Sequence, residues 1–187
     1  KSIMNVPTGH FNLDFALHYG DLPENRDLST IPGYDSSKSL GFPLGKVVEI
    51  FGDEGSGKSS VCYRVVGFAQ KMGLPCMWFD AEQSFAEGLA VVNGVDLDEL
   101  FIADNPGYAE NVFDNVFRAI ENGIKVIVID SVASLVPKEQ AEGSAEDRHM
   151  AALARVMSSN VPKVVSLAGE HNCLVIFINQ IRQKVGV

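Results

Sequence analysis

The chemistry available to this sequence is most explicit in residues 49–61, EIFGDEGSGKSSV, where glycines surround a lysine and a serine. Gly52, Gly57, Lys58 and Ser59 fit the pattern G-x-x-x-x-G-K-[ST], which holds nucleotide phosphates when it joins a strand to a helix. The glycines let backbone N–H groups point into one concavity, and the start of the next helix adds partial positive charge. In this pattern the lysine reaches the β- and γ-phosphates and the serine hydroxyl binds Mg²⁺. The predicted phosphate-binding residues are Gly52, Asp53, Glu54, Gly55, Ser56, Gly57, Lys58, Ser59 and Ser60.

Asp130, a second group with metal chemistry, ends the apolar run in VIVIDS, residues 126–131. In open α/β sheets, ligands bind at the carboxyl ends of the strands. A carboxylate there can hold a water of the Mg²⁺ ion while Ser59 binds the ion directly. An apolar run that ends in Asp is a weak signal alone, but with the glycine-rich loop earlier in the chain it favours a metal role for Asp130.

A candidate general base lies in residues 77–83, MWFDAEQ. Asp80 and Glu82 follow another predicted strand, and phosphate hydrolysis needs a carboxylate oriented on the attacking water. Glu82 is the candidate for this role. The alternative is that Asp80 and Glu82 cap the next helix, and the residue pattern alone does not separate the two interpretations.

Two amides, Asn179 and Gln180, end the last predicted strand in FINQIRQK, residues 177–184. An amide at this position can bind a γ-phosphate and lose that bond after hydrolysis. Arg182 and Lys184 follow directly, so the segment could couple nucleotide state to a polyanion. A strand-terminal Asn-Gln pair is more often only part of a turn, which makes this a moderate signal.

A regular alternation of strands and helices must position these groups. Because strands alternate with helices and are continuously apolar, we predict an α/β fold whose mostly parallel sheet is covered by helices on both faces. The predicted strands are 47–51, 76–80, 101–104, 126–130 and 174–179. The predicted helices are 12–18, 59–71, 85–93, 108–122 and 151–170.

The chain divides by composition into an amino-terminal segment, 1–45, and a core, 46–187. Residues 21–45 are rich in proline, glycine and short polar residues, which predicts a loop-like insertion. The insertion is long for a structureless connection inside a compact domain, so it favours either mobility or a bound partner.

Composition limits the class of protein. At 46% hydrophobic residues the chain can bury a sizeable core, and no apolar run approaches a membrane span. Three cysteines without metal-like spacing predict buried thiols in a reducing cytoplasm. The net charge is −9, yet residues 148–187 carry +4. A locally basic end can bind a phosphate backbone, although a solvated surface without a partner explains the charge equally simply.

These stretches together resemble the bacterial RecA recombinase family. The similarity runs from about Leu44 to the last residue, and TGHFNLDFAL, residues 8–17, is similar to the start of the family's conserved region. The motifs that support it are PLGKVVEIFGDEGSGKSS, FDAEQ, GVDLDEL, VIVIDSVASLVPKEQAEG, DRHMAALARVMS and LVIFINQIRQKVG. The resemblance implies a RecA-like P-loop NTPase core that ends, in this chain, where the second DNA-binding loop begins.

The resemblance further implies a DNA-dependent ATPase that uses ATP and Mg²⁺ and forms helical filaments of identical subunits on single-stranded DNA. Such a protein pairs and exchanges strands with double-stranded DNA during recombination and repair. The matching positions make Glu82, Lys58 and Gln180 the catalytic residues, and Ser59 and Asp130 the metal residues. Residues 142–155 match the first DNA-binding loop and its helix. The implied DNA contacts are Met150, Arg155 and Arg182.

This sequence departs from the family pattern at several positions, among them the insertion, the adenine-binding position, and Pro162, which stands where the family has an arginine, with Lys163 beside it. The insertion replaces a short link, which suggests a divergent member, encoded for example by a bacteriophage. An aromatic residue that stacks on adenine in the family corresponds to Leu89, with Ala86 nearby, and this leaves base selectivity open.

Two other functions fit the same core. One is a nucleotide-switched assembly module in which turnover is incidental, and the other is a helicase or other DNA-repair ATPase. Glu82 and Gln180 argue against the first, and GSAEDRHM and INQIRQK argue against the second.

Overall fold

The computed structural model describes residues 4–21, 23–24, 27–36, 38–138 and 146–180. Its body is a sheet of five parallel strands in the order β3-β7-β6-β4-β5. The strands are β3 Val47–Gly52, β4 Cys76–Asp80, β5 Leu100–Asp104, β6 Val126–Asp130 and β7 Leu174–Gln180. The helices that surround them are α2 Lys58–Lys71, α3 Glu87–Val92, α4 Ala109–Glu121 and α5 Glu146–His171, with a short 3₁₀ helix, η2, at Val132–Ser134.

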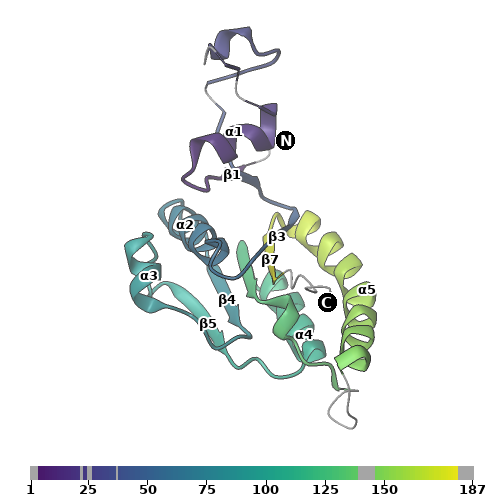
Figure 1. Cartoon of the computed structure of the whole chain (residues 1–187). Coiled ribbons are helices and arrows are strands. Elements are labelled where there is room, and N and C mark those ends of the chain that lie inside the picture. Colours follow the sequence, from purple (N-terminus) through teal and green to yellow (C-terminus); the bar gives the residue numbers. More distant parts are fainter. Residues whose placement is uncertain (1–3, 22, 25–26, 37, 139–145, 181–187) are drawn as a thin grey trace.

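Two hydrophobic cores lie on opposite faces of this sheet. Helices α2 and α3 cover one face, and α4 and α5 cover the other (Figure 1). The alternation along β6 separates the cores, because Val126 and Val128 pack towards α2 and α3, whereas Ile127 and Ile129 pack towards α4 and α5. A strand that buries both faces reads as a continuous apolar run, which confirms the predicted fold class.

The amino-terminal segment closes on itself beside the sheet. Strand β1, Asn5–Val6, pairs antiparallel with β2, Phe42–Pro43, so the two ends of the segment meet. Between them, helix α1, Phe11–Tyr19, carries the buried Phe15, and the ring centroid of Tyr34 lies 5.4 Å from that of Tyr19. The insertion therefore packs on α1 through aromatic rings. The predicted boundary between residues 45 and 46 stays a prediction.

The sequence-based boundaries of β4 and β6 match the structure, and those of the other sheet strands differ by one residue. One prediction needs correction. Helix α5 begins at Glu146 rather than at 151, since neither glycine nor proline interrupts residues 146–151. Within residues 21–45 the structure adds two short elements that were not predicted, β2 and a 3₁₀ helix, η1, at Leu28–Thr30. Elements of two or three residues are too short to show a period. No helix among the described residues is long and apolar enough to cross a membrane.

Ile127 provides a test of the packing, because its side chain is 0% exposed at the centre of the sheet. We expect Ile127→Ala to lower the free energy of unfolding by about 2–5 kcal/mol, as buried truncations do. Val165→Ala is the matched control on α5, where the side chain is 51% exposed, and it should change the value by less than about 0.5 kcal/mol. Urea denaturation measures both. Equal losses in the two variants would contradict this assignment of the core.

Candidate functional site

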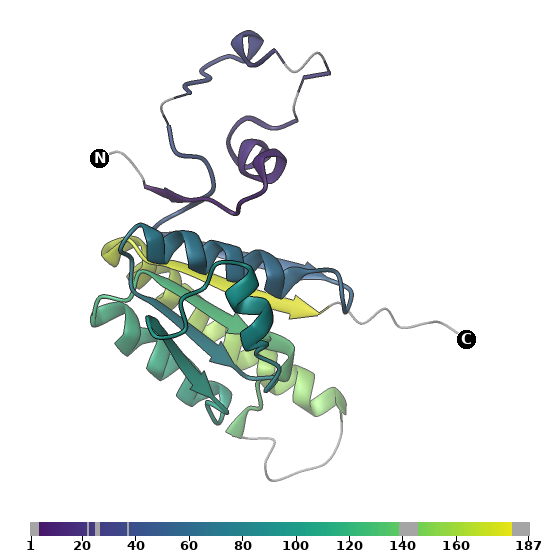
Figure 2. The ribbon, with the colours of Figure 1, turned by 90° about the vertical axis from the view of Figure 1, so that its left-hand side faces the viewer.

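The parallel sheet brings the predicted site residues to one edge. Gly52 at the end of β3 pairs with Gln180 at the end of β7, and Asp80 pairs with Asp130 across β4 and β6. The loop between β3 and α2 lies beside the end of β7 (Figure 2). The carboxyl ends of strands are where open α/β sheets bind ligands, so the candidate site lies here.

The loop from Gly52 to Gly57 has the backbone that the motif requires. Gly55 and Gly57 have φ angles of +73° and +88°, which residues with a side chain rarely adopt. The Lys58 ammonium group turns into the loop and donates hydrogen bonds to the carbonyl oxygens of Gly52, at 3.1 Å, and Asp53, at 2.7 Å. Because α2 begins at Lys58, its free N–H groups open onto the same loop. This arrangement fits the phosphates of a nucleotide.

Ser59 and Asp130 meet beneath the loop. The Ser59 hydroxyl donates a 2.9 Å hydrogen bond to Asp130 Oδ2, although the residues are 71 positions apart in the chain. A hydroxyl and a carboxylate side by side suit Mg²⁺, which usually takes one or two protein ligands and completes its shell with phosphate and water. The donor set therefore fits the predicted ion.

Burial raises the pKa of Asp130 from 3.8 to about 6. Burial removes water from the carboxylate and so disfavours the charged form, and the nearby Glu82 and Asp80 carboxylates add to the rise. The hydrogen bond from Ser59 and the positive charge of Lys58 act in the opposite direction. The site thus concentrates negative charge where a cation would relieve it.

Glu82 is held by groups from the end of β7 and from the segment that follows β6. Its Oε1 atom accepts hydrogen bonds from the Gln180 amide, at 2.9 Å, from the Ser134 hydroxyl, at 3.1 Å, and from the Ser131 hydroxyl. Glu82 therefore does not cap the next helix. The Gln180 contact also joins the predicted general base directly to the predicted γ-phosphate sensor.

The neighbouring polar residues have structural partners. Asp80 accepts the N–H groups of Ser84, at 3.0 Å, and Phe85, at 2.9 Å, so it fixes the turn before α3. Asn179 donates a 2.9 Å hydrogen bond to Glu49 on β3. Of the two strand-terminal amides, only Gln180 contacts the predicted base.

Two hydroxyls of this cluster, Ser131 and Ser134, were missed in the sequence. They stand one and four residues after Asp130, in VIVIDSVAS. Neither their residue type nor their position in the sequence distinguishes them from serines that only follow a strand.

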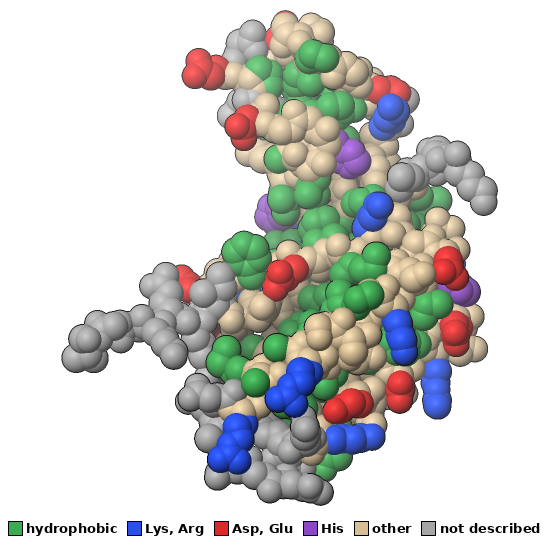
Figure 3. Space-filling model, turned by 90° about the vertical axis from the view of Figure 1, so that its right-hand side faces the viewer, with side chains coloured by type: hydrophobic (Ala, Val, Ile, Leu, Met, Phe, Trp, Pro, Cys, Tyr) green, Lys and Arg blue, Asp and Glu red, His purple; other side chains and the backbone are tan. Residues whose placement is uncertain are grey.

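The structure describes two of the three predicted DNA contacts. Met150, 66% exposed, and Arg155, also exposed, both lie on the first half of α5. Arg182 lies outside the described residues. The face that carries α5 shows lysine and arginine side chains mixed with acidic ones (Figure 3), so its described part is not a uniform basic patch.

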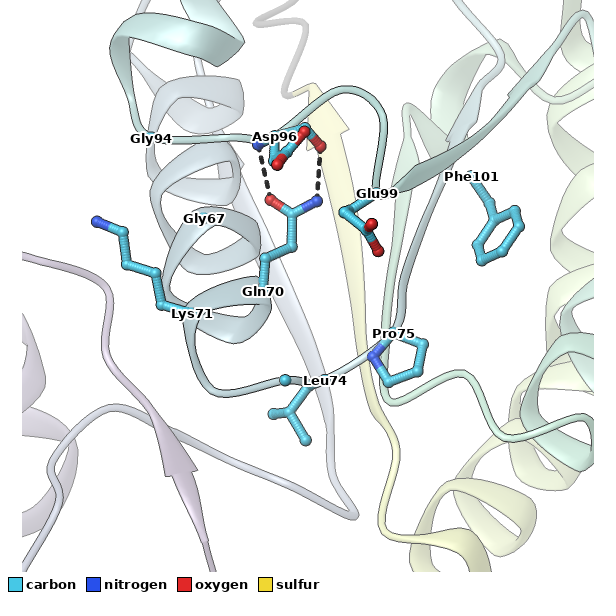
Figure 4. Close-up of a pocket in the computed structure, with 10 residues that line it drawn as sticks. Gly67, Gln70, Lys71, Leu74, Pro75, Gly94, Asp96, Glu99 and Phe101 are labelled. Carbon is cyan, nitrogen blue, oxygen red and sulfur yellow. Dashed lines mark hydrogen bonds between the residues drawn. The ribbon is translucent and has the colours of Figure 1, made fainter.

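A separate pocket lies at the opposite end of the strands, between α2 and the start of β5. Within it, Gln70 Nε2 donates to the Asp96 carbonyl at 2.7 Å, and Gln70 Oε1 accepts the Asp96 N–H at 2.9 Å (Figure 4). Glu99 and Phe101 also line it. None of the predicted site residues does, so this pocket is not the candidate nucleotide site.

Comparison with known proteins agrees with the motifs. The model of the RecA N-terminal domain matches residues 33–187. The chain is 39% identical over 189 residues to Protein RecA of Pseudomonas fluorescens, covering 100% of this chain and 47% of that protein. It is 39% identical over 186 residues to Protein RecA of Citrifermentans bemidjiense, covering 99% of this chain and 49% of the relative.

A mitochondrial DNA repair protein recA homolog of Dictyostelium discoideum is 39% identical over 184 residues, 97% of this chain and 36% of that protein. The chain thus spans about half the length, or less, of these relatives. Since a single family model covers most of its residues and the relatives match along its whole length, the chain belongs to the RecA family.

Proposed function

We propose that this protein is an ATP-dependent DNA recombinase. In this function it binds ATP with Mg²⁺, assembles with copies of itself into a helical filament on single-stranded DNA, and hydrolyses ATP in a DNA-stimulated manner. The filament pairs and exchanges strands with double-stranded DNA. Membership of the RecA family supports a recombination or repair role. ATP hydrolysis, filament assembly and strand exchange are proposed here.

One observation supports this function most strongly: the 2.9 Å hydrogen bond between Gln180 and Glu82. If Glu82 served only to activate water for ATP hydrolysis, it would need no hydrogen-bond partner on the strand that leads towards the predicted DNA-binding segment. Gln180 ends β7, two residues before Arg182. The contact therefore gives nucleotide chemistry a direct route to the predicted DNA-binding segment.

The residues divide the reaction among them. Lys58 and the loop N–H groups bind the phosphates. Ser59 and Asp130 would hold Mg²⁺, which when bound would neutralise negative charge on the phosphates. Glu82 accepts a proton from the attacking water as the water oxygen bonds to the γ-phosphorus. The bond from phosphorus to the bridging oxygen breaks, and ADP leaves with that oxygen.

The open edge of the sheet at β5 supports assembly into a filament. Strand β5 is the last in the described sheet, so one side of its backbone has no partner strand there. The side chain of Phe101 on this strand is 59% exposed. An open edge with an exposed aromatic residue is a surface that another chain can cover.

A cytoplasmic location belongs to the same proposal, because Cys62, Cys76 and Cys173 are all buried as free thiols.

Glu82→Gln tests the proposed chemistry. We expect the variant to bind ATP but to hydrolyse it roughly a hundredfold more slowly in the presence of single-stranded DNA, because an amide is a much weaker base. Steady-state release of phosphate, with and without single-stranded DNA, gives the rates. Glu87→Gln, an exposed change at the start of α3, should behave as wild type. A loss of less than about threefold in Glu82→Gln would mean that another group activates the water.

Gln180→Ala tests the coupling between ATP and DNA. In the wild type an ATP analogue should tighten single-stranded DNA binding relative to ADP by about 5–150-fold, the usual range of allosteric coupling. We expect that ratio to fall towards one in the variant, while affinity for ATP stays nearly unchanged because Lys58 and the loop remain. DNA binding measured by fluorescence anisotropy with each nucleotide gives the ratio. Asn179→Ala, which alters the adjacent amide, should keep most of it, and a full ratio in Gln180→Ala would rule out this relay.

Asp130→Asn tests the charge balance of the site without nucleotide or Mg²⁺. The folded protein binds the Asp130 proton up to about pH 6, whereas the unfolded chain releases it near pH 3.8. The contribution of Asp130 to the free energy of unfolding should therefore fall as pH rises from about 4 to 6. We expect the variant to be more stable than wild type by roughly 1–3 kcal/mol at pH 8, and the difference to shrink at pH 5. Denaturation in EDTA measures it, with exposed Asp114→Asn as the control. A difference that does not change between the two pH values would contradict the raised pKa.

A further inference from the structure

Two serine hydroxyls form a clamp on the Glu82 carboxylate. Ser131 is 0% exposed, and its hydroxyl donates to Glu82 Oε1. The Ser134 hydroxyl lies 3.1 Å from the same oxygen and 3.1 Å from the Ser131 hydroxyl. Both serines come from the segment that directly follows Asp130, so one short stretch of chain touches both the predicted metal site and the predicted base.

The available protons define the roles of the two hydroxyls. Each hydroxyl has one proton to donate. Ser131 uses its proton on Glu82, and Ser134 can then donate either to Glu82 or to Ser131. Ser131 supports Glu82 directly in both arrangements, whereas Ser134 does so in only one of them. The two serines are therefore expected to differ in importance.

The backbone around this clamp is also fixed. The N–H groups of Ala81, at 2.8 Å, and Glu82, at 3.2 Å, both donate to the Asp130 carbonyl. The turn that carries the serines is closed by a hydrogen bond from Ser134 N–H to the Ser131 carbonyl, at 3.2 Å, and is anchored by the buried Leu135. Main chain and side chain of Glu82 are thus positioned by the same few residues. Gln180, the third donor to Oε1, comes from the end of a different strand.

We propose that Ser131 and Ser134 are positioning residues for hydrolysis, which fix Oε1 of Glu82 so that Oε2 takes the proton from the attacking water. This role rests on the proposed ATPase function. Oε1 already has up to three donors, whereas Oε2 accepts no hydrogen bond from any residue that the structure describes. The serines keep the carboxylate in place when Gln180 leaves it for the γ-phosphate. A base held in the correct orientation gives a much higher rate of hydrolysis than one that can move, because misplacement of a reacting group by about 1 Å can lower the rate a hundredfold.

The test compares kcat, KM and ATP affinity for Ser131→Ala, Ser134→Ala and wild type with single-stranded DNA. We expect kcat to fall about tenfold in Ser131→Ala, the rate equivalent of one lost hydrogen bond, and about threefold in Ser134→Ala. KM and ATP affinity should stay within about twofold of wild type. Ser84→Ala is the matched control, since Ser84 is exposed in the same loop as Glu82 and no described residue bonds to its hydroxyl.

The decisive measurement repeats both substitutions in the Glu82→Gln background. A residue that acts through Glu82 should cause no further loss there, whereas one with a general structural role should lower kcat as much as before. Further loss in that background, or wild-type kcat in both single variants, would overturn the role while leaving the proposed function intact. If wild type hydrolyses no ATP, the proposed function fails and the clamp fails with it. If Ser131→Ala does not fold, Ser134→Ala, at a less buried position, decides by the same comparison.

Discussion

The candidate site is organised around one acceptor atom, Oε1 of Glu82, on which three hydrogen-bond donors converge. It receives the Gln180 amide at 2.9 Å and the hydroxyls of Ser131 and Ser134. In the proposed function, we expect the Gln180 amide to leave Glu82 when it binds the γ-phosphate of ATP. ATP then competes with Glu82 for Gln180, and its binding removes one donor from the base and moves the strand end that leads to Arg182. Coupling of this kind needs two alternative partners for one side chain, not a long chain of contacts.

The sheet makes that competition possible. Glu82 follows β4, Asp130 ends β6, and Gln180 ends β7, and parallel pairing brings all three strand ends to one edge. Ser131 comes directly after Asp130. Two cores hold the register, since a shift of one residue would exchange the side chains that face α2 with those that face α5. The same burial raises the pKa of Asp130 to about 6. The fold thus keeps a buried cluster of carboxylates, as functional sites often do at a cost in stability.

Much of the fold and of the candidate site could be predicted from the sequence. The parts that could not be predicted depend on contacts between residues far apart in the chain. The phosphate loop and β6 were predictable because the motif and the apolar run are local. Asp80 and Glu82 were not separable, since only the folded chain shows that Asp80 binds the N–H groups of its own turn while Glu82 meets Gln180, 98 positions away. Ser131 and Ser134 were missed for the same reason. The pairing of β1 with β2 joins two-residue strands across the insertion, and nothing local specifies it.

Competition between Glu82 and the γ-phosphate for Gln180 is tested by a structure of the protein with single-stranded DNA, Mg²⁺ and a slowly hydrolysed ATP analogue. We expect the Gln180 amide to leave Glu82 and to lie within hydrogen-bond distance of the γ-phosphate, while Ser131 stays bound to Oε1 and Oε2 faces the water in line with the γ-phosphorus. A structure in which Gln180 still donates to Glu82 with the γ-phosphate bound by other groups would contradict it.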